Sequence, residues 1–138
     1  MAIFYDYTIT VDGNKATLNK DIYLYKDNRN IIYYFSIKNA PFKFVDLTDM
    51  IESTEATYAN IKILKPNGVK EKFSKIPIEN GKVKLKIDKE FIDEISEIGN
   101  YTFQIDLFDN EDGFITIPPV YNQFHVLEPL FDDDSTTG

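Results

Sequence analysis

The stretch Glu97-Ile98-Gly99-Asn100-Tyr101-Thr102-Phe103 decides how the rest of the sequence is interpreted. An acidic residue is followed by glycine after two positions, by tyrosine after two more, and by an apolar residue after a further two. Glycine permits a close approach of the chain into a strand, and a tyrosine hydroxyl at this spacing can bond back to the backbone. We interpret the stretch as a tyrosine corner in which Phe103 stands where a disulfide-bonded domain would have its second cysteine.

Segments on both sides of this corner alternate between apolar and polar residues, as half-buried strands do. Turn residues separate them, most clearly in Lys65-Pro66-Asn67-Gly68 and Glu79-Asn80-Gly81. The corner and the many short strands predict an all-β protein with one short helix, an immunoglobulin-like antiparallel β-sandwich. The predicted strands cover residues 3–9, 18–24, 31–37, 59–63, 69–73, 82–87, 101–107, 114–117 and 120–127.

The periodicity changes only over residues 88–96, where apolar residues recur at three- and four-residue spacing. Asp88 can cap this short amphipathic helix, and we expect Gly99 to end it. Residues 39–57 are less regular, and we expect them to form a connection with a helical turn around 47–52.

Length and composition indicate one soluble domain. The chain has 138 residues, no cysteine and a formal net charge of −8. It therefore has neither disulfides nor thiolate metal sites, as expected of a protein that folds in a reducing cytoplasm, and its acidity argues against nucleic-acid binding. We expect no targeting segment, no membrane span, a β-sandwich domain over 1–128, and over 129–138 an acidic linker or the point where a longer protein continues.

Few residues carry a signature of catalysis or metal binding. His125 has no second histidine, no cysteine and no carboxylate at ligand spacing, and no serine lies in a nucleophile elbow. Asp109-Asn110-Glu111-Asp112-Gly113 has the composition of a calcium loop but lacks its downstream glutamate, so we interpret it as a hairpin turn. We predict no enzyme activity, no catalytic residue, no cofactor and no metal.

Lys82, Lys84 and Lys86 form the polar face of one predicted strand and are the candidate docking face. The alternative is a solvated edge that resists aggregation. The charges are also polarised along the chain: residues 62–89 carry nine basic and three acidic residues, whereas residues 90–138 carry twelve acidic and no basic ones. Segregation of these segments in space would favour ordered docking, and pairing between neighbouring strands would cancel it.

Tyr23, Tyr25 and Tyr34 lie opposite the aliphatic residues of their predicted strands. Exposed tyrosines on one face could form a platform for stacking sugars. The alternative is that they pack beneath the long connection or in a second core layer.

The order of the motifs adds a resemblance to a known family. Asp21-Ile22-Tyr23-Leu24-Tyr25-Lys26-Asp27-Asn28-Arg29-Asn30 is followed by a strand, a long connection, the Lys-Pro-Asn-Gly hairpin and a short helix. Ile98-Gly99-Asn100-Tyr101-Thr102-Phe103-Gln104-Ile105 and the closing Ile115-Thr116-Ile117-Pro118-Pro119 complete the series. Up to about Glu128, this order resembles the N-terminal domain of the baseplate upper protein of tailed phages that infect Gram-positive bacteria.

The resemblance implies a non-enzymatic virion protein that folds in the host cytoplasm and is oligomeric in the assembled tail. Its β-sandwich would anchor to the distal tail protein of the central baseplate and link it to receptor-binding proteins for host attachment. Two other hypotheses are a carbohydrate-binding module that uses the surface tyrosines and a small accessory domain of a secreted hydrolase.

Overall fold

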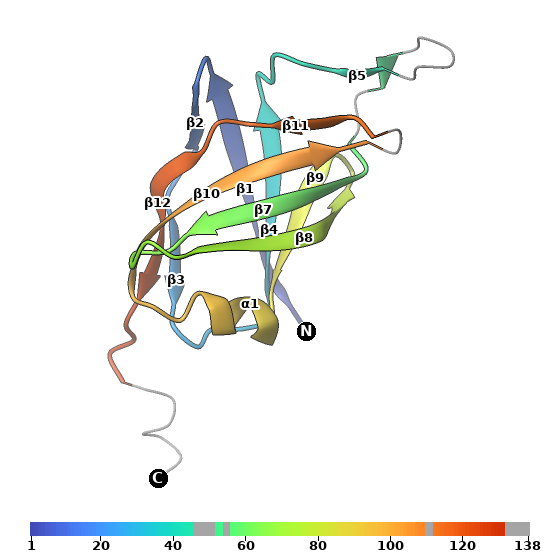
Figure 1. Cartoon of the computed structure of the whole chain (residues 1–138). Helices are drawn as coiled ribbons and strands as arrows, with labels where there is room; N and C mark the ends of the chain where they lie inside the picture. The colour runs from blue at the N-terminus through green and yellow to red at the C-terminus, as the bar shows by residue number, and fades with distance from the viewer. Residues whose placement is uncertain (46–51, 54–55, 110–111, 132–138) are drawn as a thin grey trace.

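The structure is a computed structural model that describes residues 1–45, 52–53, 56–109 and 112–131. Its described elements are strands and one short helix (Figure 1). Apolar residues on alternate positions face inward, as the sequence pattern predicts. The elements are β1 (Ile3–Asp12), β2 (Lys15–Leu18), β3 (Ile22–Tyr25), β4 (Ile31–Lys38), β5 (Phe44–Val45), β6 (Glu52–Ser53), β7 (Tyr58–Leu64), β8 (Lys70–Glu79), β9 (Lys82–Ile87), α1 (Lys89–Glu94), β10 (Gly99–Phe108), β11 (Phe114–Thr116) and β12 (Val120–Leu127).

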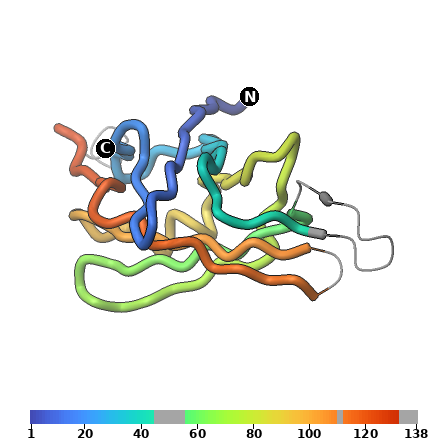
Figure 2. The backbone as a smooth tube through the Cα atoms, turned by 90° about the horizontal axis from the view of Figure 1, so that it is seen from above, coloured from blue at the N-terminus to red at the C-terminus, as the bar shows by residue number. Residues whose placement is uncertain are grey.

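The main sheet closes on itself as a barrel. Strands follow in the hydrogen-bonded order β10-β7-β8-β9-β4-β1-β2-β12, and a pairing between β12 and β10 completes the circle of eight (Figures 1 and 2). β3 continues along β12 beyond β2, and β11 continues along β10 beyond β12. At two positions around the barrel, two strands thus follow one another along the same neighbour. β2 and β3 both pair with β12, and β12 and β11 both pair with the same edge of β10.

The predicted immunoglobulin-like antiparallel sandwich is therefore wrong, although the all-β class is correct. One continuous sheet replaces two stacked sheets, and β1 and β4 run parallel, with Tyr5 opposite Tyr33. β12 also pairs in parallel with β2 and β3. Alternation records which side chains face the core, and this pattern is the same in a sandwich and in a barrel. The two architectures differ in which strands pair, and the two-residue alternation of apolar and polar side chains does not depend on that pairing.

Aromatic rings fill the centre of the barrel. The ring of Phe103 lies 5.5 Å from that of Phe35 and 6.4 Å from that of Phe124, between centroids. Tyr33, which is 1% exposed, contacts Phe124 edge-on at 6.0 Å. The prediction that Phe103 is a core residue is confirmed, since it is buried among these rings. Its comparison with the second cysteine of a disulfide-bonded sandwich fails together with the sandwich.

The tyrosine corner is present within the barrel. The Tyr101 hydroxyl donates a hydrogen bond to the carbonyl oxygen of Glu97 at 2.6 Å. Gly99 has a φ of +143°, and a Cβ atom at this position would lie 2.8 Å from Cγ of Pro66 in the β7–β8 turn. The close approach that the sequence predicts at this glycine is present, and the structure identifies the neighbour as the β7–β8 turn.

Helix α1 begins where the sequence places it. Asp88 caps it by accepting a hydrogen bond from the Phe91 amide at 3.1 Å. The helix ends at Glu94, with Ile95 as its C-cap, so the prediction that Gly99 ends it is wrong, because Gly99 already belongs to β10. Phe91 is buried, with its ring 4.5 Å from that of Phe73, and α1 lies across one end of the barrel (Figure 1).

Other predicted boundaries differ in detail. Residues 18–24 are two strands rather than one, with the break at residues 19–21. The strand expected over 69–73 continues to Glu79, because the pairing with β7 shifts register near Lys75, whose φ is +57°. The predicted helical turn at 47–52 lies outside the described residues, apart from Glu52 in β6.

Candidate docking surfaces

The three predicted docking lysines lie on the outer face of β9. Lys82 pairs with Asp6 of β1 at 3.2 Å between Nζ and Oδ1, and Lys84 pairs with Glu79 of β8 at 3.1 Å between Nζ and Oε2. Lys86 is exposed and has no ion pair within the part of the chain that the structure describes. The strand is thus partly neutralised at one end and cationic at the other.

Pairing between strands also balances part of the charge polarisation. Lys62 of β7 lies 3.0 Å from Asp106 of β10, and Lys65 lies 3.2 Å from Glu94 of α1, between nitrogen and oxygen. Both pairs join the basic middle of the sequence to its acidic last third. These ion pairs between neighbouring elements neutralise part of the charge, so the basic and acidic segments of the sequence are not wholly separated in space.

β8 and β9 diverge after a short pairing. Their ladder consists of Ile78 opposite Val83 and Glu79 opposite Lys82. Beyond it lies a hollow of about 460 Å³, which we name the β8–β9 groove. Its lining includes Lys72, Phe73, Ile76, Lys84, Lys86 and Phe91, with Asp88 and Glu90 at the helix end. Two of the three predicted lysines thus border a real concavity, whereas Lys82 does not.

The structure brings two of the three candidate tyrosines together. Tyr23 and Tyr25 lie on β3 and are 62% and 47% exposed. Tyr34 lies on β4, half-buried and edge-on against Phe4 of β1, with 6.0 Å between ring centroids. Because β1 lies between β4 and β2 in the strand order, Tyr34 belongs to a different part of the wall. A platform of all three tyrosines is therefore not formed, while the pair on β3 is open to solvent.

His125 lies beside the tyrosine pair in a polar network. Its Nε2 lies 2.7 Å from Oδ2 of Asp21, its Nδ1 lies 2.6 Å from Oδ1 of Asn100, and the Tyr23 ring stacks on it at 5.0 Å. The sequence expectation of no nearby carboxylate fails because Asp21 is distant along the chain. Hydrogen bonds from Gln123, and then from His125, lower the pKa of Asp21 below its usual 3.8. With both ring nitrogens occupied, His125 joins β12 to β10 and to the β2–β3 connection.

The acidic turn after β10 is closed by its first residue. The Gly113 amide donates to Oδ1 of Asp109 at 2.7 Å, and the Asp109 amide donates to the Gly113 carbonyl oxygen at 3.0 Å. The hairpin-turn interpretation is confirmed, since β10 and β11 pair across it. Asn110 and Glu111 lie outside the described residues, and within the rest no group of three acidic or histidine side chains could hold a metal ion.

A stack of three aromatic rings on the outer wall was not predicted. Phe108 of β10 stacks on Tyr58 of β7 at 4.7 Å and on Phe114 of β11 at 4.8 Å between centroids. Register places the three residues directly opposite one another across the strands. The sequence does contain a sign of this stack. Phe108 occupies an outward-facing position of its strand, in line with Thr102, Gln104 and Asp106, so an apolar ring is expected outside the core.

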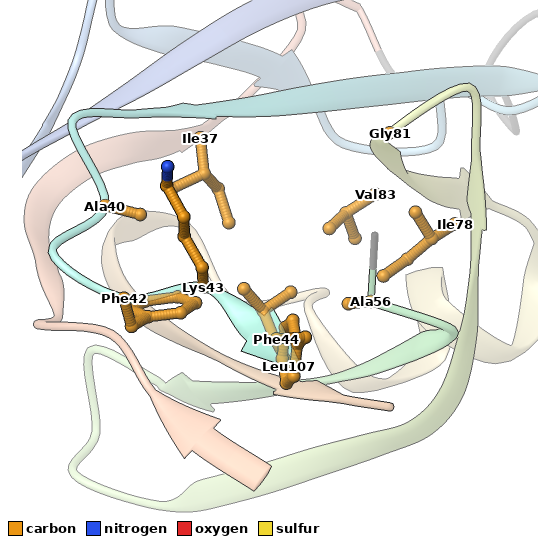
Figure 3. A pocket seen from close by; sticks show the side chains of 10 residues that line it. All are labelled: Ile37, Ala40, Phe42, Lys43, Phe44, Ala56, Ile78, Gly81, Val83 and Leu107. Atoms are coloured by element: carbon orange, nitrogen blue, oxygen red, sulfur yellow. The ribbon is translucent and has the colours of Figure 1, made fainter. Parts of the chain in front are cut away.

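An apolar hollow of about 230 Å³ lies at the end of the barrel opposite α1 (Figure 3). Its walls come from β4, β9 and β10 through Ile37, Val83 and Leu107, and from the β4–β5 connection through Phe42. Lys43 is the one charged residue among the described residues that line it. A binding site normally sets several polar groups against an apolar wall. This hollow supplies packing surface and little else.

These features define a small β-barrel module whose main polar groups are engaged by its own chain and whose grooves and rings face outward. No described helix has the length and apolar composition needed to span a membrane. The chain is similar to a solved structure, the N-terminal domain of phage TP901-1 ORF48, with 11% sequence identity and a TM-score of 0.48 over 91% of this chain and 98% of that chain. No family model and no curated protein matches the chain.

Proposed function

We propose that the chain is a non-enzymatic structural module of a phage tail baseplate. In this role it docks onto the distal tail protein of the central baseplate and links it to receptor-binding proteins. The order of motifs from Asp21 to Pro119, with the tyrosine corner near its end, supports the assignment to a baseplate. The module would fold in the host cytoplasm, act in the virion and be present in several copies per tail.

The observation that carries the docking role is the outer wall formed by β9 and the groove beside it. Lys84 and Lys86 border a hollow with the apolar rings of Phe73 and Phe91 in its lining. Protein interfaces combine such apolar anchors with a charged rim that steers the partner and sets its orientation. Side chains elsewhere that could perform chemistry, such as His125 and Asp106, are held by internal contacts.

Affinity capture from infected cells tests the assignment. A tagged chain is expected to retain the distal tail protein, identified by mass spectrometry, and to lose it when Lys82, Lys84 and Lys86 are all replaced by Glu. A control with Lys15, Lys26 and Lys38 replaced by Glu changes the net charge equally and is expected to retain the partner. If the tagged wild-type chain captures no tail protein, the baseplate role is wrong.

A carbohydrate-binding module is the alternative, and the exposure of Tyr23 and Tyr25 on β3 favours it. Stacking on sugar rings needs exposed aromatic faces of this kind. Binding on a glycan array that disappears in both Tyr23→Ala and Tyr25→Ala variants would support this alternative. Tyr121→Ala provides the control, since Tyr121 is 64% exposed on β12 and outside the predicted platform.

A further inference from the structure

The wall of the barrel is incomplete between β8 and β9. β9 pairs with β4 from Val83 to Ile87, but on its other side the ladder with β8 ends at Val83. β8 pairs with β7 from Lys70 to Pro77, and in the described part of the chain no strand covers its other side over this range. Two strand edges with unpaired backbone groups therefore border the groove. Such edges accept an added strand, unless side chains discourage it.

The chemistry of the groove selects the kind of strand that fits. Phe73 and Ile76, both half-buried, provide an apolar surface, and the buried ring of Phe91 supports it from behind, with 4.5 Å between the centroids of Phe73 and Phe91. Lys72 and Lys86 are exposed at the rim and have no ion pair within the described ranges. An extended segment with large apolar residues next to carboxylates would satisfy both features.

The chain itself contains a segment of this composition. Leu130 and Phe131 are 91% and 76% exposed, so neither packs against its own barrel. The next three residues in the sequence are Asp132, Asp133 and Asp134. Two apolar side chains directly before three carboxylates match the apolar surface of the groove and the side of its rim that carries Lys72 and Lys86, away from Asp88 and Glu90 at the helix end.

We propose that the β8–β9 groove binds the segment 130–134 of a second copy of this chain, which adds as a strand along the free edge of β9. Leu130 and Phe131 of the bound segment pack against Phe73 and Ile76, and its aspartates face Lys72 and Lys86. Because the groove and the segment are different surfaces, the contact is head-to-tail and can repeat from copy to copy. The contact requires no tail ring, so it can be tested on the chain alone. It shares the β8–β9 groove with the proposed baseplate role, so a bound second copy and the distal tail protein would compete for this surface.

Two variants of the full chain separate the two halves of the contact. The groove variant carries Lys72→Glu and Lys86→Glu, and the tail variant carries Phe131→Ser with Asp132, Asp133 and Asp134 each replaced by Asn. Sedimentation velocity over a range of concentrations is expected to show reversible self-association of the wild type that weakens with salt. Each variant alone is expected to remain monomeric, because each lacks one half of the contact.

A mixture of the two variants gives the sharpest result. The intact groove of the tail variant can bind the intact tail of the groove variant, but no further copy can join. The mixture is therefore expected to form dimers and nothing larger. Lys82→Glu serves as the control, since Lys82 lies outside the groove and its replacement is expected to leave self-association unchanged.

A labelled peptide with the sequence of residues 129–138 provides a second measurement. It is expected to bind the tail variant, and binding to a chain that also carries Lys72→Glu and Lys86→Glu is expected to be weaker by roughly tenfold or more. The proposal is overturned if the wild type stays monomeric and the peptide fails to bind. It is also overturned if the tail variant self-associates like the wild type, because another surface would then be responsible.

Discussion

The Tyr101 hydroxyl lies 2.6 Å from the carbonyl oxygen of Glu97, and this hydrogen bond fixes the entry of the chain into β10. β10 is the strand around which the barrel closes, since it pairs with β7 on one side and with β11 and β12 on the other. The ring of Tyr101 is buried, so the bond is shielded from water. A local feature within five residues thus secures a strand that pairs with three others.

Replacing Tyr101 by Phe should lower the free energy of unfolding by about 1–2 kcal/mol, because the Glu97 carbonyl loses its partner while the ring stays packed. Tyr23→Phe is the matched control, since the Tyr23 ring is 62% exposed, and we expect it to change stability by less than about 0.5 kcal/mol. Urea unfolding of the three proteins measures both effects. Equal stability of all three would show that the bond contributes nothing.

Stability should fall at alkaline pH. Burial, together with the nearby Glu97 charge, raises the pKa of Tyr101 from 10 to about 12. A raised pKa in the folded state stabilises the fold fully below pH 10, and this contribution is lost as pH rises from 10 to about 12. The stability advantage of wild type over Tyr101→Phe should therefore shrink across this interval. A difference that stays constant from pH 9 to about 12 would contradict the assignment.

Gly99→Ala should destabilise the chain by about 2–4 kcal/mol, since it combines an unfavourable backbone conformation with a steric clash. The new Cβ atom would lie 2.8 Å from Cγ of Pro66. Gly13→Ala is the control and should cost only about 1 kcal/mol, because Gly13 also has a positive φ but a Cβ atom there would meet no neighbour within 4 Å. Thermal unfolding compares them, and equal losses would exclude the clash with the β7–β8 turn.

Asp106→Ala should cost about 1–3 kcal/mol, because the Asp106 side chain is buried and accepts contacts from two neighbouring strands. Lys62 lies 3.0 Å from Oδ1 of Asp106, and the Thr116 hydroxyl donates to the same oxygen at 2.7 Å. Asp6→Ala removes the exposed pair with Lys82 and should cost less than about 1 kcal/mol. Chemical denaturation of both variants tests the order, and a larger loss for Asp6→Ala would reverse the interpretation.

Local features of this fold could be predicted from the sequence, and the closure of the barrel could not. The corner at Tyr101, the cap at Asp88 and the turn at Gly81 each depend on a few neighbouring residues, and all three are present. The parallel pairing of β1 with β4 and the joining of β12 to β10 depend on contacts between distant segments. The inward and outward faces of each strand carry the same residues in a sandwich and in a barrel, so periodicity cannot distinguish the two folds.

For the candidate surfaces too, the sequence predicts which side chains face outward but not which of them come together. Alternation placed Lys84, Lys86, Tyr23 and Tyr25 on the outside, where the structure has them. The groove beside Lys86 arises from the divergence of β8 and β9, and the contact of His125 with Asp21 arises from the pairing of β12 with β3. These relationships are properties of the pairing, so no single segment of the sequence contains them.

Binding of the purified chain to purified rings of the distal tail protein tests the central claim most directly. Titration calorimetry at low and high salt should give a saturable complex that weakens as salt increases, because the lysines on the outer face of β9 contribute to it. Replacing Lys82, Lys84 and Lys86 by Glu should weaken the complex by roughly tenfold or more, whereas the same change at Lys15, Lys26 and Lys38 should not. Absence of any complex between the folded wild-type chain and the ring would contradict the proposed function.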